Sequence, residues 1–513
     1  MLAGALLGSQ RSRITLLVLI LLAAWALYAW SELRPAGIAG DWHGWRQTDT
    51  QTIALNLAQP DASILKPQIS WGGDGPGYVE TEFQLYTWLV SLLLRLFGPV
   101  EWAGQLVSLL AICATAVVVF RHLSHKYHPA AACIGFGALL AARLPAHMAT
   151  VVMPDALALL AYVSAWSFFV RYSRGGNTRD LLVYGIAGVL AMLIKPTTAH
   201  LGISSFLLLL FANRARLRDY RVWIAWTAMV AVFALYLLHA HRLYADYGNT
   251  FGLLVGEDSK VPHLQHLLNP ELYLATARIA LMWGIGPVAA VILVIQGLRR
   301  RLDAEQLALL AGNVVVVLIA LRYMSDAAGV HYYAPILLLT ASLVASLAND
   351  MLKAGAWRHA ALGLMCALLL AQGYRSVMIR QDLARNYTGD VGILPAGGVV
   401  AAGKALAPLV NHGDLIVVRS ALNAYDPAWQ QAVNFHDPRI FYITGTRGWT
   451  LGREQQDPQL LSEAASRGAR YLVDPLIDGA PGIDAWASSH GELVWSGTGG
   501  GRIWKLRPGP PDL

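Results

Sequence analysis

The stretch FQLYTWLVSLLLRLFG, from Phe83 to Gly98, decides how the rest of the chain is oriented. As a helix it measures roughly 22 Å between its end residues, whereas the hydrocarbon core of a bilayer is about 30 Å thick. Arg95 lies near its end. Such a helix either spans a bilayer or stays at one surface, and the two choices give the following segments opposite orientations.

The composition places the chain among polytopic membrane proteins. Of its 513 residues, 56% are hydrophobic and only 14% are charged, which exceeds the apolar share of soluble domains. The net charge of +7 does not indicate nucleic-acid binding, because Lys and Arg occur in short clusters between apolar runs. The three cysteines lie inside apolar runs, so the sequence indicates no disulfide framework.

The apolar runs predict eleven transmembrane helices. The first run, Ile14 to Trp30, follows a basic start and has no small-residue cleavage site after it, so we expect an uncleaved span with a cytoplasmic N-terminus. Ten further runs lie near residues 103–121, 129–147, 155–171, 181–195, 198–213, 222–240, 274–298, 306–323, 332–348 and 358–378. Several are shorter than the about 20 residues of a perpendicular span.

The arginine clusters indicate whether residues 83–98 cross the bilayer. If the segment stays at the outer face, the clusters RYSRGGNTR, NRARLRDYR and GLRRR all lie in the cytoplasm, as the positive-inside bias favours. We therefore expect a re-entrant or interfacial helix and a C-terminus outside. The predicted fold is an α-helical membrane domain over residues 1–380, with surface helices in the first outer loop, 31–101.

The sequence changes character after about residue 380. The runs DLIVV, RIFYIT, YLVD, ELVWS and RIWKL are short, apolar or alternating, and separated by turn signals, with one helical stretch at PQLLSEAASRGAR. Residues 381–513 therefore predict a small soluble α/β domain. By the parity of the spans this domain lies outside the cytoplasm.

The first outer loop concentrates polar side chains that a surface loop does not need, namely Asp41, His43, Arg46 and Asp49. Thr48 and Gln51 form a capping-box pattern, which predicts a helix that starts at Asp49 and ends before Pro60. Its apolar stripe suggests a helix along the membrane surface. A carboxylate at a helix start is stabilised by the helix dipole and needs no function. The presence of several other polar side chains close to Asp49 in the sequence is therefore what indicates a functional site.

Five segments, in this order, resemble landmarks of the C-type membrane glycosyltransferases, which include protein O-mannosyltransferases and the lipid A aminoarabinose transferase. They are HGWRQTDT, ETEFQLYTWLVSLLLRLFG, MPDALAL, LIKP and HYYAP, starting at residues 43, 80, 153, 193 and 331. The resemblance implies an inverting transfer of a sugar from a polyprenyl phosphate to a glycan, lipid or protein acceptor. The reaction would occur on the outer face of the cytoplasmic membrane.

The resemblance implies that Asp49 is the catalytic base and that Asp155 shares or exchanges this role. Lys195 could bind the donor phosphate or simply extend its ammonium group to the interface. Arg46 and Arg322 are further candidates for the phosphate. The remaining expected substrate-binding residues are Asp41, His43, Glu82, His331, Tyr332 and Tyr333, of which the last three also suit an interfacial aromatic belt.

Two questions stay open in the sequence. Relatives often have a second acid after the first, where this chain has Thr50, and some use a metal; Glu80, Glu82 and His331 are possible ligands of a divalent cation, but their spacing is loose. A lipid-linked sugar flippase is the alternative function. Transporters tend to show internal repeats and paired broken helices, which the sequence does not indicate.

Overall fold

The computed structural model describes residues 10–253, 264–353, 355–386, 398–426, 431–432, 434–497 and 500–507. The chain forms two compact units that are discontinuous in sequence. The helical unit comprises Met1–Arg34, Gln105–Tyr236 and Lys260–Asp382, and the mixed unit comprises Pro35–Gly104, Leu237–Ser259 and Leu383–Leu513. The division into continuous domains at residue 380 stays a prediction, since the first outer loop groups with the C-terminal segment by contacts.

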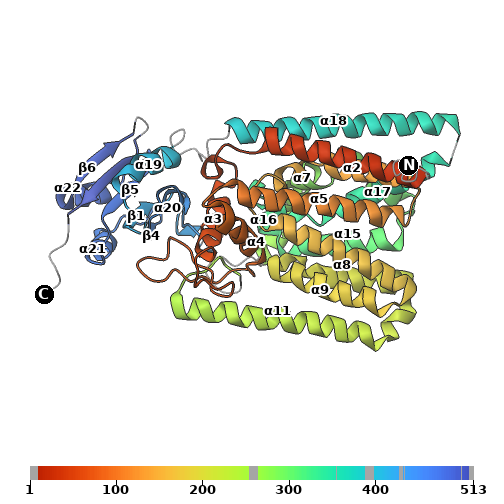
Figure 1. Cartoon of the computed structure of the whole chain (residues 1–513), viewed down its shortest axis with the longest axis horizontal. Coiled ribbons are helices and arrows are strands. Elements are labelled where there is room, and N and C mark those ends of the chain that lie inside the picture. Colours follow the sequence, from red (N-terminus) through yellow and green to blue (C-terminus); the bar gives the residue numbers. More distant parts are fainter. Residues whose placement is uncertain are drawn as a thin grey trace. The chain divides into compact units, whose positions relative to one another are not determined.

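The long apolar helices of the chain identify a multi-pass membrane protein (Figure 1). Five helices are long and apolar enough to cross a bilayer, at Ser12–Leu33, Trp102–Ser124, Asp155–Gly175, Tyr220–Tyr247 and Ala356–Asn386. These correspond to α2 with η1, α5, α8, α11 and α18. A sixth candidate is a pair bent by 115°, Pro270–Gly284 and Gly286–Leu298, formed by α13, η5 and α14. The expected total of eleven spans stays a prediction.

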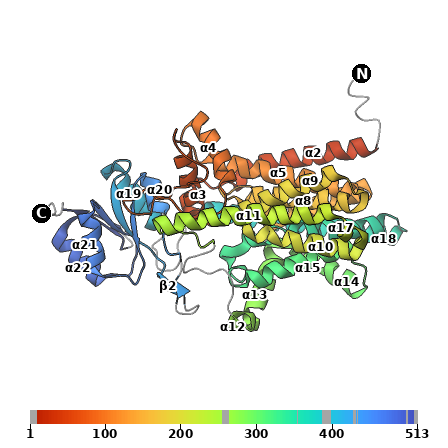
Figure 2. The same ribbon diagram turned by 90° about the horizontal axis from the view of Figure 1, so that it is seen from below.

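Shorter helices complete the helical unit, as the view from below shows (Figure 2). They are α6 (Pro129–Ala141), α7 (Arg143–Met148), α9 (Thr178–Ile194), η3 (Pro196–Ala199), α10 (His200–Ala212), η4 (Arg214–Arg218), α12 (Leu264–Leu267), α15 (Ala304–Ile319), α16 (Leu321–Met324), η6 (Ala327–Tyr333) and α17 (Ile336–Leu352). Helix α8 packs along α9, α6 along α17, and α10 along α15. Gly135 allows the close approach of α6 to α17, since a Cβ there would lie 2.6 Å from the carbonyl oxygen of Ala341.

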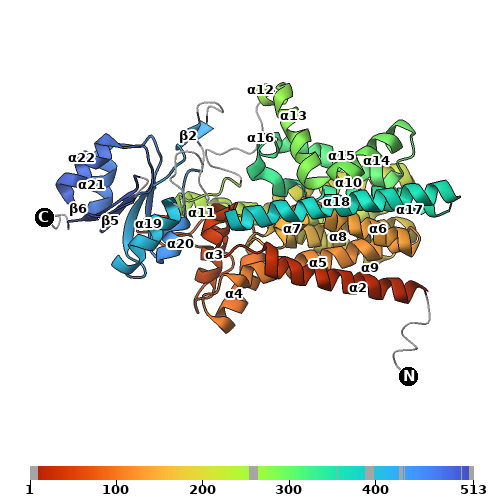
Figure 3. The ribbon, with the colours of Figure 1, turned by 90° about the horizontal axis from the view of Figure 1, so that it is seen from above.

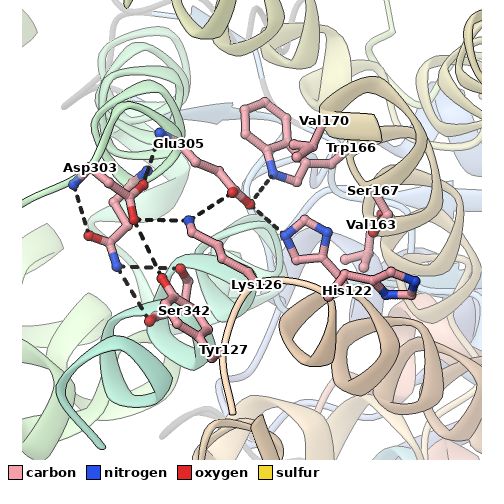
Figure 4. Close-up of polar contacts among 12 residues, drawn as sticks. His122, Lys126, Tyr127, Val163, Trp166, Ser167, Val170, Asp303, Glu305 and Ser342 are labelled. Carbon is pink, nitrogen blue, oxygen red and sulfur yellow. Dashed lines mark hydrogen bonds and ion pairs between the residues drawn. The ribbon is translucent and has the colours of Figure 1, made fainter. Parts of the chain in front are cut away.

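A buried carboxylate ties three of these helices together (Figure 4). Glu305 at the start of α15 lies 2.5 Å from Nε2 of His122 and 2.8 Å from Nζ of Lys126, and it accepts a hydrogen bond of 3.1 Å from the indole of Trp166. Asp303 caps α15 through a capping box with Gln306. Since Oε1 of Glu305 contacts both His122 and Trp166 and Oε2 accepts from Lys126, we interpret this cluster as a structural connection between α5, α8 and α15.

The mixed unit contains a five-stranded sheet, of which β5 and β6 are labelled in Figure 3, and its strand order is β4-β1-β5-β7-β6. The strands are β1 (Leu415–Arg419), β4 (Arg447–Leu451), β5 (Tyr471–Asp474), β6 (Gly491–Ser496) and β7 (Arg502–Leu506). Strands β4, β1 and β5 are parallel to one another, and β7 pairs antiparallel with both of its neighbours, β5 and β6. A separate pair joins β2 (Tyr425–Asp426) and β3 (Gln431–Ala432).

Alternate residues of the strands enter two hydrophobic cores, one on each face of the sheet. Helices α21 (Pro458–Ser466) and α22 (Pro481–His490) cover one face, where Val417 and Leu472 are buried. Helices α19 (Gly398–Leu406) and α20 (Arg439–Thr444) cover the other, followed in the chain after α19 by η7 (Ala407–Leu409). Four of the five predicted strand-like runs form strands, but RIFYIT is wrong, because it forms α20, and β4 was not predicted.

The second core also contains residues from the first outer loop. This loop forms η2 (Ile38–Gly40), α3 (Gly44–Leu57) and α4 (Leu85–Phe97), and α3 packs on both α4 and α20. Ile53, Leu57 and Trp71 share one cluster of buried side chains with Ile416 and Phe441. The apolar stripe of α3 therefore packs inside protein, contrary to the prediction of a helix along the membrane surface.

Candidate functional site

Asp49 lies in the interior of helix α3 and not at its first position. The helix begins at Gly44, and His43 is its N-cap in the left-handed conformation with a φ of 66°. The predicted capping box is wrong, because the Thr48 hydroxyl donates to the Gly44 carbonyl at 2.9 Å and the Gln51 amide donates to the Val100 carbonyl at 3.1 Å. The helix start five residues earlier moves Asp49 into the second turn, away from the unpaired N–H groups.

The early start of α3 depends on a tight turn before it. A Cβ on Gly44 would lie 2.5 Å from the carbonyl oxygen of Ala39, so only glycine fits there. A left-handed conformation is uncommon for a residue such as His43, and backbone of this kind is often found near functional sites. The sequence HG at positions 43 and 44 was therefore the signal for the helix start.

The Asp49 carboxyl is fully buried, and only one of its two oxygens accepts a hydrogen bond from a described residue. The Trp71 indole donates to its Oδ1 at 3.0 Å, while Oδ2 has no hydrogen-bond partner among the described residues. Burial raises the pKa of Asp49 to about 7, against the opposing effects of the Trp71 hydrogen bond and the Arg46 charge. Desolvation therefore outweighs the groups that stabilise the ionised form of Asp49.

Arg46 and Glu82, both predicted as substrate-binding residues, form an ion pair in the same unit. The Arg46 guanidinium also lies over the ring of Phe251, 5.0 Å from its centroid. The charge of Arg46 acts on Asp49 in the opposite direction to that of Glu82. Arg46 therefore lowers the pKa of Asp49 through its charge, while it is itself paired with Glu82.

Asp41 and His43 lie in the turn that leads into α3. The side chain of Gln47 donates to the Asp41 carboxylate at 2.8 Å, which connects the turn to the first helical turn. The His43 ring lies 4.1 Å from that of Trp42. Both predicted residues thus belong to the structure around the start of α3, and their substrate contacts stay a prediction.

His436, which the sequence did not reveal, contacts Trp71, the hydrogen-bond partner of Asp49. Its ring stacks on Trp71 with centroids 4.0 Å apart and an interplanar angle of 5°, and burial lowers its pKa to about 4. The next residue, Asp437, is paired with Arg439 at 2.7 Å and raises the pKa of Asp49 through its charge. In the sequence these residues belong to the polar run FHDPR before α20. Because this run is far from Asp49 along the chain, the sequence alone provides no reason to expect it near that acid.

A second group of predicted residues comes together in the helical unit. Lys195 lies 3.1 Å from Oδ1 of Asp155 and its ammonium group lies over the ring of Tyr332, 5.1 Å from the centroid. The other oxygen of Asp155 is buried and has no partner among the described residues. His331 lies beside Tyr332, with ring centroids 4.4 Å apart. Proline at position 196 ends α9, which places Lys195 at the helix end.

Arg322 and Tyr333 have different surroundings. The Arg322 guanidinium lies 5.3 Å from the ring of Tyr323, which in turn neighbours Tyr332. The Tyr333 hydroxyl donates to the carbonyls of Thr276 and Met324, at 3.0 and 2.6 Å, and its side chain is buried. The Tyr333 hydroxyl is thus used in hydrogen bonds that support the fold. Arg322 instead lies next to the aromatic side chains of Tyr323 and Tyr332.

The possible metal ligands belong to two different units. Within the residues that the structure describes, no three His, Cys, Asp or Glu side chains gather as they would around a metal ion; Glu80 and Glu82 lie in the mixed unit and His331 in the helical unit, so their joint site stays a prediction. The Glu80 carboxylate accepts a hydrogen bond from Thr250, and its other oxygen is buried without a described partner.

Comparison with known proteins agrees with the resemblance seen in the sequence. The model of the family described as "Dolichyl-phosphate-mannose-protein mannosyltransferase" matches residues 84–239. No curated protein gives a match. The resemblance to C-type glycosyltransferases is thereby confirmed in the segment that begins just before α4 and ends in α11.

The fold is shared with solved glycosyltransferases at low identity. The structure is similar to ArnT from Cupriavidus metallidurans in the apo state, with 12% identity, 96% of this chain and 99% of that chain covered, and a TM-score of 0.62. ArnT bound to undecaprenyl phosphate gives 12% identity, coverage of 95% and 97%, and a TM-score of 0.57. The arabinofuranosyltransferase AftD from Mycobacteria gives 14% identity, coverage of 96% and 40%, and a TM-score of 0.56.

Proposed function

We propose that this protein is a glycosyltransferase that moves a sugar from a polyprenyl-phosphate donor to a hydroxyl of an envelope glycan, lipid or protein. The observation that carries the proposal is Asp49, a fully buried acid with one oxygen unmatched in the described structure and a pKa of about 7. A general base is most effective when its pKa lies near the working pH. The similarity to ArnT with undecaprenyl phosphate supports the class of donor.

In the proposed reaction, Asp49 in its ionised form accepts the proton of the acceptor hydroxyl through Oδ2. The hydroxyl oxygen forms a bond to the anomeric carbon while the bond from that carbon to the phosphate oxygen breaks. The phosphate leaves with the bonding electrons as polyprenyl phosphate, and attack from the opposite side inverts the anomeric centre. Trp71 fixes Oδ1, so the carboxyl presents its other oxygen to the proton.

Both protonation states of Asp49 are populated near neutral pH. With a pKa of about 7, roughly half of the molecules are ionised at neutral pH, and the neutral acid regains its proton-accepting form by releasing the proton to solvent. A carboxylate with the ordinary pKa would be a weaker base. Burial therefore increases the basicity that the transfer step requires.

We propose that Lys195 binds the phosphate of the donor. Its ammonium group already has Asp155 at 3.1 Å and the face of Tyr332 at 5.1 Å, which hold the charge in place. A phosphate that approaches Lys195 replaces water with a charge-assisted hydrogen bond, and Arg46 and Arg322 are further candidates for this contact. Asp155 then acts mainly by holding Lys195, and Tyr332 offers a ring face to a sugar.

We further propose that the protein lies in the cytoplasmic (inner) membrane and that residues 381–513 lie outside the cytoplasm, in the periplasm or its extracytoplasmic equivalent. The positive-inside bias of the three arginine clusters supports this orientation. Cysteines introduced at positions 75 and 101 should both react with an impermeant reagent added outside. Reaction of the second only after permeabilisation would contradict the eleven-span topology.

Reconstitution with a labelled polyprenyl-phosphate sugar tests the function. A transferase releases free polyprenyl phosphate when an acceptor extract is supplied, and Asp49→Asn should abolish this release while the donor still binds. A flippase, the alternative function, would move intact donor across the bilayer and release no free lipid phosphate. Movement of intact donor with no release, in wild-type protein that binds the donor, would overturn the proposal.

A further inference from the structure

A long apolar cavity lies within the helical unit, separate from the groups described above. It has a volume of about 700 Å³ and is walled mainly by α14, α17 and α18. Its lining includes Val291 of α14, Leu347 of α17, and Leu364 and Leu368 of α18. A volume in the range of about 300–1,000 Å³ suits a ligand of small-molecule size, so the cavity can take one lipid chain but not a whole lipid.

One end of this cavity is polar and positively charged. Arg143 and Arg375 both line it, together with the amide of Gln372. The Arg143 guanidinium lies over the ring of Trp283 at 4.9 Å, and its buried Nε has no hydrogen-bond partner among the described residues. The lining contains no Asp or Glu. Two arginines that share one pocket without a lining carboxylate repel each other unless an anion lies between or beside them.

The position of the arginines along α18 matches the thickness of a bilayer. Arg358 near the start of α18 and Arg375 are separated by a helical rise of roughly 26 Å, close to the about 30 Å of a hydrocarbon core. If the start of α18 lies at one interface, Arg375 lies near the other, at the depth of lipid headgroups. From Arg375 the apolar lining follows α18 back to Ala361, at roughly 1.5 Å per residue.

The bend between α13 and α14 is part of the cavity wall. The two helices meet at 115°, and Gly286 at the bend has a φ of 71°. This left-handed conformation favours glycine at the bend, and a Cβ on Gly286 would lie 2.6 Å from Nε2 of Gln372, whose side-chain end would have to move. Helix α14 is thereby turned away from α13, which leaves the space against α17 and α18.

We propose that this cavity binds one acyl chain of an anionic phospholipid of the surrounding bilayer, with the lipid phosphate at Arg143 and Arg375. The charge of the two guanidinium groups complements a phosphate, and arginine binds phosphate through paired N–H donors. The sugar donor is the less suitable occupant, because transfer needs an acid and the lining has none. This site goes beyond the proposed transfer activity and can be tested without turnover.

The test is lipid retention by the full-length protein, measured by native mass spectrometry after purification from vesicles of phosphatidylglycerol or phosphatidylcholine with the same chains. Wild-type protein should retain phosphatidylglycerol on the order of tenfold more than phosphatidylcholine. Arg143→Gln combined with Arg375→Gln should abolish this preference. Arg358→Gln is the matched control, because it removes an exposed arginine from the other end of the same helix and should change nothing.

A second variant tests the apolar part of the cavity. Ala371→Phe keeps both arginines and fills space along α18, so it should lower the retention of phosphatidylglycerol severalfold. Equal retention of both lipids by wild-type protein, or a preference that survives in the double arginine variant, would overturn the proposal. Displacement of phosphatidylglycerol by polyprenyl phosphate at equal concentration would also overturn it, because the cavity would then belong to the donor.

Discussion

Two buried carboxylates, Glu305 and Asp49, have opposite surroundings. Glu305 in the helical unit has His122, Lys126 and Trp166 within 2.5 to 3.1 Å, and Arg174 lies 3.8 Å away. Asp49 in the mixed unit has one indole hydrogen bond and a second oxygen without a described partner. Figure 4 shows how completely the first is surrounded by donors.

The difference separates a structural acid from one that is available for chemistry. A buried carboxylate that only supports the fold is stabilised by opposite charges and hydrogen bonds, because desolvation is costly. Asp49 lacks this compensation, and the nearby carboxylates of Asp437 and Glu82 add repulsion. Its ionised form is thus held at a high free energy, and this increases its tendency to accept a proton.

The largest expected effect is on turnover in Asp49→Asn. Asparagine keeps the shape and can still accept the Trp71 hydrogen bond, but it cannot take a proton. We expect turnover at saturating donor to fall about 10²- to 10⁴-fold, with donor binding little changed. Asp155→Asn is the comparison, because it should mainly raise the KM for the donor by loosening Lys195. Wild-type turnover in Asp49→Asn would show that Asp49 is not the base.

The converse is expected for Glu305→Gln, which should affect stability and not chemistry. The substitution leaves the largely buried ammonium group of Lys126 without a full counter-charge, and the loss of such a partner costs about 3–5 kcal/mol. Thermal unfolding in detergent, monitored by circular dichroism, checks this. The protein that remains folded should keep its turnover per molecule. Unchanged stability would contradict the structural role of the cluster.

The stability of Asp49→Asn should depend on pH in a direction opposite to that of most carboxylate variants. In wild-type protein the pKa of Asp49 rises from 3.8 in the unfolded chain to about 7 in the folded chain. Between about pH 4 and pH 7 the folded state therefore holds the extra proton, and stability falls as pH rises. Asp49→Asn removes this loss, so we expect a gain of a few kcal/mol at pH 8 and none below pH 4. An equal effect at both pH values would exclude the raised pKa.

The smallest expected effect is a shift of the pH profile in Trp71→Phe. Phenylalanine keeps an aromatic ring for His436 but has no N–H for Asp49, and that hydrogen bond lowers the pKa of the acid. Turnover in wild-type protein should rise with pH through about 7 as Asp49 ionises. In Trp71→Phe the midpoint should move to higher pH by about one unit, as expected for a hydrogen bond to a charged group. A midpoint that moves down would contradict this contact.

Local patterns predicted much of the site but not its geometry. The order of the motifs led to Asp49, Asp155 and Lys195, and the structure pairs the last two directly. The capping-box prediction at Thr48 is wrong because that pattern considers only two residues three positions apart. The helix instead begins at Gly44, after a tight turn in which Gly44 lies against the carbonyl of Ala39. The possible metal site stays a prediction, since sequence spacing says little about side chains on different segments.

The C-terminal region shows the same limit. Alternating apolar residues predicted four strands, because a strand with one or two buried faces has that pattern wherever it lies. RIFYIT has the composition of a strand and forms α20, where Ile440 and Phe441 enter a core that also holds Ile53 and Leu57 of the first outer loop. Tertiary packing overrode the local propensity there.

The sequence by itself determined the membrane character of the chain, because apolar runs and arginine clusters interact with the bilayer independently of their neighbours. It also determined which acid to suspect. Only the tertiary structure decided what that acid can do, since the pKa of Asp49 depends on burial, on Trp71 and on Asp437, which lies almost four hundred residues away in the sequence. Desolvation and Coulomb energy depend on distance in space, and the fold sets that distance.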